Sequence, residues 1–342
     1  MKIQLTAILL SLPLTSLAHE GNHDKTPQPV ITEKVQTGNG RFIYEADAQW
    51  GKLPNNEKLG PTHGGVAVDA NGLIYVTTDG PQSMFVFKAD GSLVKKMAPE
   101  ARGIHHLTIV KEGEKEFLYG AQLNAYGGKT PPRIVKLDLD GKILLEISAK
   151  TAPKLQGGFG GITGVAVAPN SNIYVSMGYG SNLIHIFDKA GKHIKSFGGR
   201  GKEKEKFTTP HTLNIDTRFG QARLLISDRE KRRLVHFDLN GNYIGDYATK
   251  LRRPCAVSFF GEFCAVAELE SRVVILDKSG AIVSILGDNP DKKKWANFGV
   301  KPKDQKLGLF SAPHGLSFDK DGNLYVQDWN TTGRATQLKL QK

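Results

Sequence analysis

Cysteine is scarce in this sequence: the chain of 342 residues contains only two, Cys255 and Cys264. Two cysteines cannot build the disulfide framework that stabilises many exported domains, so the fold must be stabilised by burial of apolar surface. Across a hairpin, Cys255 should face residues near Glu268, which leaves Cys264 about four residues, or ~13 Å, out of register. We therefore predict two free thiols.

Long apolar runs are also missing, except at the start of the chain. The run from Ile3 to Leu14 follows a charged Lys2 and precedes a small-residue exit at Ser16-Leu17-Ala18, a pattern typical of a secretory signal. The run is too short to span a bilayer. We expect residues 1–18 to be a signal peptide, the protein to be periplasmic or secreted, and no segment to span the membrane.

Basic residues are plentiful, but they lack the arrangement that nucleic-acid binding needs. The formal net charge is +12, and much of it lies in connecting segments such as 202–206 and 292–294. Nucleic-acid surfaces place basic residues among aromatic ones on a single face, and that pattern is absent here. We expect no nucleic-acid partner, a monomer, and some attraction of acidic substrates.

A polar leader follows the predicted signal. Residues 19–40 contain Pro27 and Pro29 and few apolar side chains, so we expect a flexible segment. His19 and His23 stand at its start; they fit an exposed tail better than a metal site. The folded domain is predicted to cover residues 41–342.

From residue 60 onward the chain repeats one unit six times. Each unit opens with a short apolar alternation that predicts a strand. The six copies are 62–69, 104–109, 162–167, 210–215, 254–259 and 312–319.

Three further strands and two tight turns follow each opening strand. The turns carry Asp or Asn before glycine, as in Asp69-Ala70-Asn71-Gly72, which supplies the left-handed backbone angles that such turns need. The last unit lacks its outer strand, and Phe42–Asp47 at the other end of the chain is a lone strand that can replace it. The sequence thus predicts an all-β, six-bladed β-propeller that the N-terminal strand closes. The units resemble NHL repeats.

Three of the six opening strands carry histidine at the same position: His105, His211 and His314. They belong to alternate blades, which are about 120° apart in a six-bladed ring, so their imidazoles should meet on the axis. Three neutral imidazoles with an open fourth position are the ligands of a catalytic zinc site. His106 must point the other way along its strand and is excluded as a ligand.

The second strand of each unit returns to the face from which the first strand starts. Residues just after it should therefore lie beside the metal, and these include Tyr179 on blade three and Arg229 on blade four. A phenolate can act as general base, and a guanidinium can bind a substrate carboxylate. Cys255 occupies the histidine position of blade five, where we expect it to be buried as a small apolar residue.

This pattern resembles the peptidyl-α-hydroxyglycine α-amidating lyase family over about residues 42–340. The strongest part is 207–237, where Phe-x-x-Pro-His leads to Ser-Asp-Arg-Glu. The resemblance implies zinc on the three histidines, a catalytic role for Tyr179 and substrate binding by Arg229. It implies cleavage of a carboxylate-bearing small molecule or peptide to an amide and glyoxylate.

The chain departs from that family in several respects, including its disulfide positions, and two of them concern candidate ligands of the site. A further active-site arginine is implied on the first blade, where this chain has His63 and Asp79, with Arg102 nearby. His63 and Arg102 are therefore candidate substrate-binding residues. The family's structural calcium uses an aspartate directly after the third histidine, where this chain has Gly315, so calcium is expected less than zinc.

The alternative hypothesis is a non-catalytic NHL propeller that binds a protein or peptide on the same face and uses the metal structurally. Lactonase-like six-bladed hydrolases are disfavoured, because they place Glu, Asn and Asp at the axial positions that hold histidine here.

Overall fold

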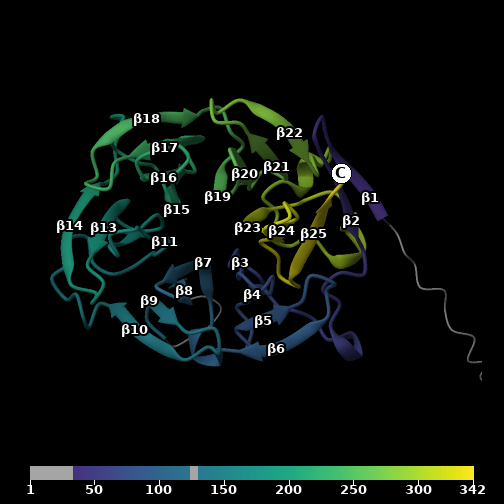
Figure 1. The fold of residues 1–342 in the computed structure, drawn as a ribbon, viewed down its shortest axis with the longest axis horizontal. Helices are drawn as coiled ribbons and strands as arrows, with labels where there is room; N and C mark the ends of the chain where they lie inside the picture. Colours follow the sequence, from purple (N-terminus) through teal and green to yellow (C-terminus); the bar gives the residue numbers. More distant parts are fainter. Residues whose placement is uncertain (1–33, 124–129) are drawn as a thin grey trace, which may run out of the picture. The chain divides into compact units, whose positions relative to one another are not determined.

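Six β-sheets are arranged in a ring around a central axis (Figure 1). This computed structural model describes residues 34–123 and 130–342, and Thr32–Lys342 form one compact unit. The predicted six-bladed β-propeller is confirmed. The predicted signal peptide and most of the predicted leader lie outside the described residues.

In each of the first three blades, the four strands run in chain order from the centre of the ring outward. Blade one contains β3 (Val66–Val68), β4 (Ile74–Thr77), β5 (Met84–Phe87) and β6 (Leu93–Met97). Blade two contains β7 (Ile104–Glu112), β8 (Lys115–Gln122), β9 (Arg133–Leu137) and β10 (Ile143–Ser148). Blade three contains β11 (Gly164–Val167), β12 (Ile173–Ser176), β13 (Leu183–Phe187) and β14 (His193–Gly198).

The remaining blades repeat this order. Blade four contains β15 (Pro210–Asp216), β16 (Arg223–Asp228), β17 (Arg233–Phe237) and β18 (Tyr243–Ala248). Blade five contains β19 (Pro254–Phe260), β20 (Phe263–Glu268), β21 (Arg272–Leu276) and β22 (Ile282–Leu286). Blade six contains β23 (Pro313–Phe318), β24 (Leu324–Asp328), β25 (Arg334–Leu340), β2 (Phe42–Asp47) and β1 (Lys34–Asn39).

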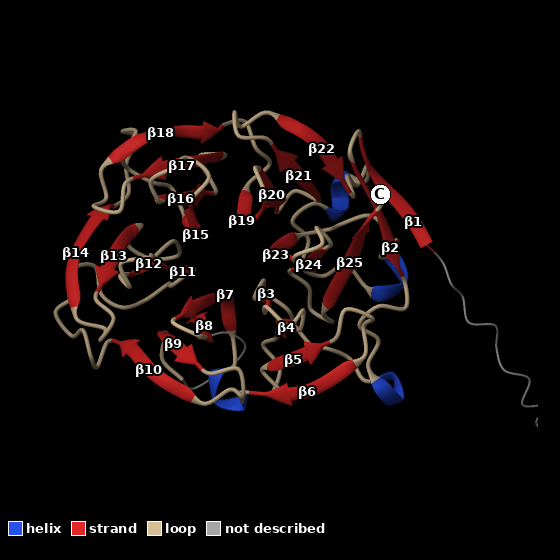
Figure 2. Cartoon of the chain, in the orientation of Figure 1, coloured by secondary structure: helices blue, strands red, loops and turns tan. Residues whose placement is uncertain are grey.

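Helical structure in the described residues is limited to short 3₁₀ turns (Figure 2). These turns are η1 (Pro54–Asn56), η2 (Pro99–Ala101), η3 (Lys292–Lys294) and η4 (Pro302–Asp304). None of these helices, in the part of the chain that the structure describes, has the length and apolar character needed to cross a membrane.

The two ends of the described chain meet in blade six. Strand β2 pairs antiparallel with β25, with Tyr44 opposite Leu340 and Ala46 opposite Leu338. The ring is therefore closed by the N-terminal strand, as the sequence predicts. Closure by backbone hydrogen bonds leaves no blade incomplete.

Strand β1 differs from the expectation for the leader. The sequence predicts a flexible leader over residues 19–40, yet residues 34–39 form a hairpin with β2. The hairpin also contacts blade five: Ser284 Oγ accepts from Asn39 N at 3.1 Å, and Thr37 Oγ1 accepts from Gly287 N at 2.7 Å. The segment lacks the apolar alternation that predicts a strand. Its order comes instead from backbone and polar contacts with distant residues.

The tight turns of the repeat are fixed by aspartate side chains. The Asp69 carboxylate accepts hydrogen bonds from Asn71 N at 2.9 Å and Leu73 N at 2.8 Å. Gly72 has φ +79°, a left-handed conformation that favours glycine. The same pair of bonds recurs at other blades, at Asp138, Asp188, Asp238, Asp277 and Asp319.

The core consists of apolar layers between neighbouring blades. One layer joins blades three and four through residues such as Tyr174, Phe207 and Phe237, all fully buried. Comparable layers lie at the other blade junctions. Truncating a buried phenylalanine such as Phe207 to alanine should cost about 3–5 kcal/mol. These layers fix the positions of the innermost strands around the axis.

Candidate metal centre

Each of the three axial histidines lies in a β-bulge at the start of an innermost strand. The register shifts between Ile104 and His106, between Pro210 and Leu213, and between Pro313 and Gly315, so the ladder breaks at His105, His211 and His314. A bulge inserts an extra residue and re-aims its side chain. The bulges direct these imidazoles toward the axis.

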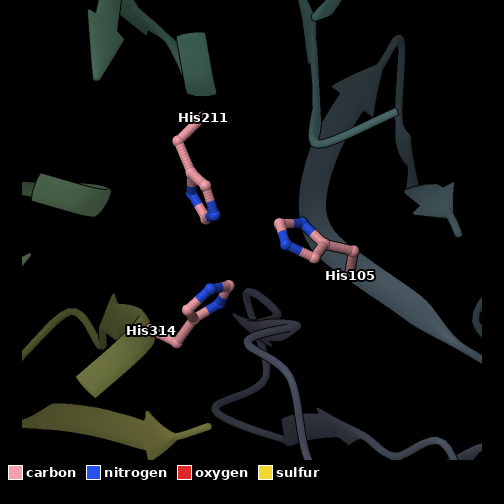
Figure 3. A group of neighbouring side chains, drawn as sticks. All are labelled: His105, His211 and His314. Carbon is pink, nitrogen blue, oxygen red and sulfur yellow. The ribbon is translucent and has the colours of Figure 1, made fainter. Parts of the chain in front are cut away.

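The three imidazoles converge on one point (Figure 3). The ring centroids are 4.8 Å apart for His105 and His211, 4.9 Å for His105 and His314, and 4.6 Å for His211 and His314. One ring nitrogen from each lies within 4.8 Å of the others. All three residues are buried. The group could hold a metal ion, as the alternate-blade spacing predicts.

Two of these imidazoles are oriented by carbonyl oxygens of the next blade. His105 Nδ1 lies 2.7 Å from Thr163 O, and His211 Nδ1 lies 2.8 Å from Cys255 O. A carbonyl oxygen only accepts, so each Nδ1 carries the proton and each neutral ring has a free lone pair on Nε2. This orientation by a second partner is common among metal-binding histidines.

Burial keeps the three rings neutral. It is the largest cause that lowers the pKa of His105, His211 and His314 well below 6.5, and neighbouring cations and imidazoles add to it. Metal ions bind neutral imidazole, so the protonation state fits a ligand role.

The Tyr179 hydroxyl lies beside two of the candidate ligands. It is 3.2 Å from His105 Nε2 and 3.0 Å from His211 Nε2. Both nitrogens are acceptors, and a phenol has one proton, so the hydroxyl can donate to only one of them at a time. A cation between these lone pairs would satisfy both, which means that the donor set fits a metal. His314 Nδ1 is buried and has no hydrogen-bond partner among the described residues.

Arg229 also lies at the site, in contact with Tyr179. Its Nη1 donates to the Tyr179 hydroxyl at 3.0 Å, and its guanidinium lies 5.2 Å from the Tyr179 ring centroid. Tyr179 is 42% exposed as a residue, but loss of water around its hydroxyl raises the pKa of Tyr179 to about 12, and the charge of Arg229 opposes the shift. The structure thus brings together the predicted tyrosine, the predicted arginine and the histidines.

His63 also lies at the site. Its ring centroid is 5.3 Å from that of His105 and 5.9 Å from that of His314, and its Nδ1 is 2.8 Å from the Asp79 carboxylate. Arg102 has a different position. Its Nε donates to the Asp79 carbonyl at 2.6 Å, so Arg102 supports the loop behind His63 and is not among the residues that line the cavity described next.

A cavity of about 430 Å³ reaches the site at His63 and His314. The predicted residues that line it are His63, Tyr179, Arg229 and His314. Four further residues line it that the sequence reasoning missed: Arg253, Leu269, Ala296 and Trp329.

A usable signal for two of these residues was present in the sequence. Leu269 and Trp329 directly follow the second strands of blades five and six, as Arg229 does on blade four. The rule that selected Arg229 therefore also selects them. Ala296 belongs to a long connection before β23, and no repeat pattern could locate it.

Cys255 and His106 have the placements that the sequence suggests. Both cysteines are free, as predicted, and both are buried, as expected for Cys255. Cys255 lies at the corresponding bulge of blade five, and burial raises the pKa of its thiol to about 11. His106 Nδ1 accepts from Val165 N at 3.3 Å, away from the triad.

The position that would supply a calcium ligand does not fit that role. Gly315 packs against blade one so closely that a Cβ would collide with the carbonyl oxygen of Gly64. An aspartate side chain has no room there. Among the described residues, the histidine triad is the one group of three or more candidate ligands that could hold a metal ion.

Known proteins share this architecture. A family model described as a 6-bladed beta-propeller matches residues 159–263. Streptogramin B lyase has a similar structure, with a TM-score of 0.56 and 15% identity over 88% of this chain and 98% of the other.

Two further solved structures are similar. A catalytically inactive virginiamycin B lyase from Staphylococcus aureus with quinupristin has a TM-score of 0.55 and 14% identity, covering 85% of this chain and 98% of the other. A protein of unknown function from Bacteroides thetaiotaomicron has a TM-score of 0.59 and 13% identity, covering 90% and 76%. At such identities these likenesses establish the fold. The protein is a six-bladed β-propeller with a buried triad of axial histidines.

Proposed function

We propose that this protein is an exported zinc-dependent lyase that cleaves α-hydroxyglycine-type substrates to an amide and glyoxylate. The observation that carries the proposal is the Tyr179 hydroxyl, which contacts Nε2 of His105 and His211 and also Arg229. A single oxygen in contact with a candidate metal site and with a cation is well placed for proton transfer at a metal-polarised substrate.

The metal would be held by His105, His211 and His314, the three neutral imidazoles on the axis. Zinc bound there would supply Lewis-acid polarisation of the substrate hydroxyl. The candidate ligands are all imidazole nitrogens, with no carboxylate among them, and such a donor set is compatible with zinc.

Arg229 and Tyr179 have separate roles in this reaction. The Arg229 guanidinium binds the substrate carboxylate and orients the α-carbon. Tyr179 accepts the hydroxyl proton as the carbon–oxygen double bond of glyoxylate forms and the carbon–nitrogen bond breaks. The proton ends on the amide nitrogen, which leaves as the primary amide, so atoms and charge balance and Tyr179 is regenerated.

The base must be ionised when it acts. Burial raises the pKa of Tyr179 to about 12, so the phenol is protonated at neutral pH when no other cation is near. The Arg229 charge already favours the phenolate, and a divalent cation at the triad would favour it further. Loading with metal is therefore a requirement for activity in this proposal.

The test combines metal content with product formation. Purified protein should contain one zinc per chain by elemental analysis, and His211→Ala should lose it. Incubation with N-benzoyl-α-hydroxyglycine should release glyoxylate and benzamide in equal amounts. A fully zinc-loaded protein that releases neither product would remove the lyase assignment.

A second candidate is a non-catalytic propeller that binds a peptide or protein on this face and uses the metal structurally. The observation that favours it is the pair His63 and Asp79, which stands where the family resemblance implies a further active-site arginine. In that case Tyr179→Phe and Arg229→Met would weaken partner binding, and no hydroxyglycine compound would be turned over.

A further inference from the structure

The cavity beside the triad contains a second arginine that the proposed reaction does not use. Arg253 lies directly before β19 of blade five and lines the same cavity as Arg229 of blade four. Two guanidinium groups therefore face one space beside the candidate metal centre. Guanidinium groups repel each other, so their proximity requires a physical explanation.

Glu230 holds the two arginines together. Its Oε1 accepts from Arg229 Nε at 2.9 Å and from Arg253 Nη2 at 2.7 Å, while its Oε2 accepts from Arg253 Nε at 3.1 Å. Burial opposes ionisation of this carboxyl group, but the hydrogen bond and charge of Arg253 and the charge of Arg229 prevail and lower its pKa. The three side chains carry a net charge of about +1 at neutral pH. One further anion would balance it.

The contacts leave part of the Arg253 guanidinium available. Glu230 occupies Nε and Nη2, and no acceptor for Nη1 is found among the described residues. The backbone at Arg253 forms a defined turn, because Arg253 has φ +57° and precedes the buried Pro254. Thr209 has the same position and a similar φ on blade four, so the turn belongs to the repeat and the guanidinium is particular to blade five.

Part of the cavity lining is apolar, and it begins directly beside Arg253, where Leu269 N donates to Arg253 O at 3.0 Å. Leu269, Ala296 and Trp329 form it, and the Trp329 ring stacks on Phe298 with centroids 4.6 Å apart. A ligand whose carboxylate contacts the arginines would extend its other end along this wall. Apolar walls of this kind favour aliphatic or aromatic groups.

We infer that Arg253 is a second carboxylate anchor, positioned by Glu230, and that the substrate is an N-acylated amino acid derivative with an apolar or aromatic acyl group. This inference rests on the proposed function for its choice of substrate. Arg229 and Arg253 bind the carboxylate from two blades, and the acyl group packs against Leu269, Ala296 and Trp329.

Binding of an unreactive probe tests the inference separately from turnover. Benzoylglycine has the carboxylate and the aromatic acyl group but no hydroxyl to react. Its affinity for the zinc-loaded protein is measured by calorimetry, together with that of its methyl ester and of acetylglycine. Wild-type protein should bind benzoylglycine at least about tenfold more tightly than either compound, because each lacks one of the two recognised groups.

Variants assign the binding to Arg253. Arg253→Met should weaken benzoylglycine binding by about 10- to 100-fold and leave the weak binding of the methyl ester unchanged. Arg253→Lys should recover part of the loss, because it keeps the charge without the planar fork. Arg232→Met is the matched control: Arg232 pairs with Glu270, lies outside the cavity, and its loss should leave benzoylglycine binding unchanged.

The outcomes separate the two proposals. Equal affinity of wild type and Arg253→Met for benzoylglycine, with both folded by circular dichroism, overturns the anchor. Equal binding of acetylglycine and benzoylglycine overturns the apolar acyl group. Binding that depends on Arg253 without any glyoxylate release from a hydroxyglycine supports the anchor and removes the lyase reaction.

Discussion

Zinc should stabilise the folded protein through the histidine triad, and His211→Ala should abolish that effect. His211 is fully buried, and its Nδ1 donates to Cys255 O. Thr212 Oγ1 also donates to Cys255 O, at 2.6 Å, so truncation leaves this carbonyl with a partner. The variant should therefore fold, at a cost of roughly 2–4 kcal/mol for the lost contacts.

The size of the zinc effect follows from mass action and from the size of the domain. Zinc at 100 times its dissociation constant stabilises the native state by about 2.7 kcal/mol. The compact unit Thr32–Lys342 has about 310 residues, which implies an unfolding entropy of roughly 0.65 kcal/mol per kelvin. The midpoint of thermal unfolding should rise by about 4 °C in the wild type, and by less than about 1 °C in His211→Ala.

The assay is differential scanning calorimetry of chelator-treated protein, with and without added zinc. His106→Ala is the matched control, because His106 is a buried neighbour of His105 that bonds Val165 N instead of facing the triad. It should unfold at a lower temperature than wild type and keep the full zinc response. An equal zinc shift in His211→Ala and wild type, or no shift in either, would refute the reasoning.

Three further predictions concern the base, acid stability and export. Tyr179→Phe should retain zinc and lower kcat about 10²- to 10⁴-fold, because it removes the proton acceptor; a variant with wild-type turnover would exclude that role. Burial, followed by the neighbouring His193, lowers the pKa of His185 to about 4, so the unfolded state, with a pKa near 6.5, binds a proton first as pH falls. This contribution to the free energy of unfolding is complete above about pH 6.5, and about 3 kcal/mol of it is lost as the pH falls toward 4. In urea titrations at pH 7 and pH 4, the free energy of unfolding should therefore fall less in His185→Gln than in wild type. Mass spectrometry of exported protein should find His19 at the N-terminus, whereas an intact Met1 would contradict the signal peptide.

The repeated architecture could be predicted from the sequence because its causes are local. Alternating apolar residues specify each short strand, and Asp69 and its counterparts specify the turns through bonds to residues two and four positions later. The lone strand Phe42–Asp47 and the missing outer strand of blade six indicated the closure that β2 and β25 form. The histidine spacing then indicated a meeting point on the axis.

Strand β1 and the second arginine could not be predicted in this way. The polar residues 34–39 are ordered by bonds to Ser284 and Gly287, which lie about 250 positions away. Arg253 precedes an ordinary Pro-Cys pair, and nothing in its surroundings in the sequence indicates that Glu230 joins it to Arg229. Contacts between blades leave no periodic pattern, because each depends on which side chain the neighbouring blade presents.

The sequence by itself determined the number of blades, the ring closure and the set of histidines that face the axis. Only the tertiary structure decided the surroundings of those histidines. These are the bulges that aim the rings, the carbonyl oxygens of Thr163 and Cys255 that accept from Nδ1 of His105 and His211, and the cavity beside them. Strands and turns arise from residues near one another in the chain. The chemistry of the site arises from groups on different blades, and these come within hydrogen-bond distance only when the ring closes.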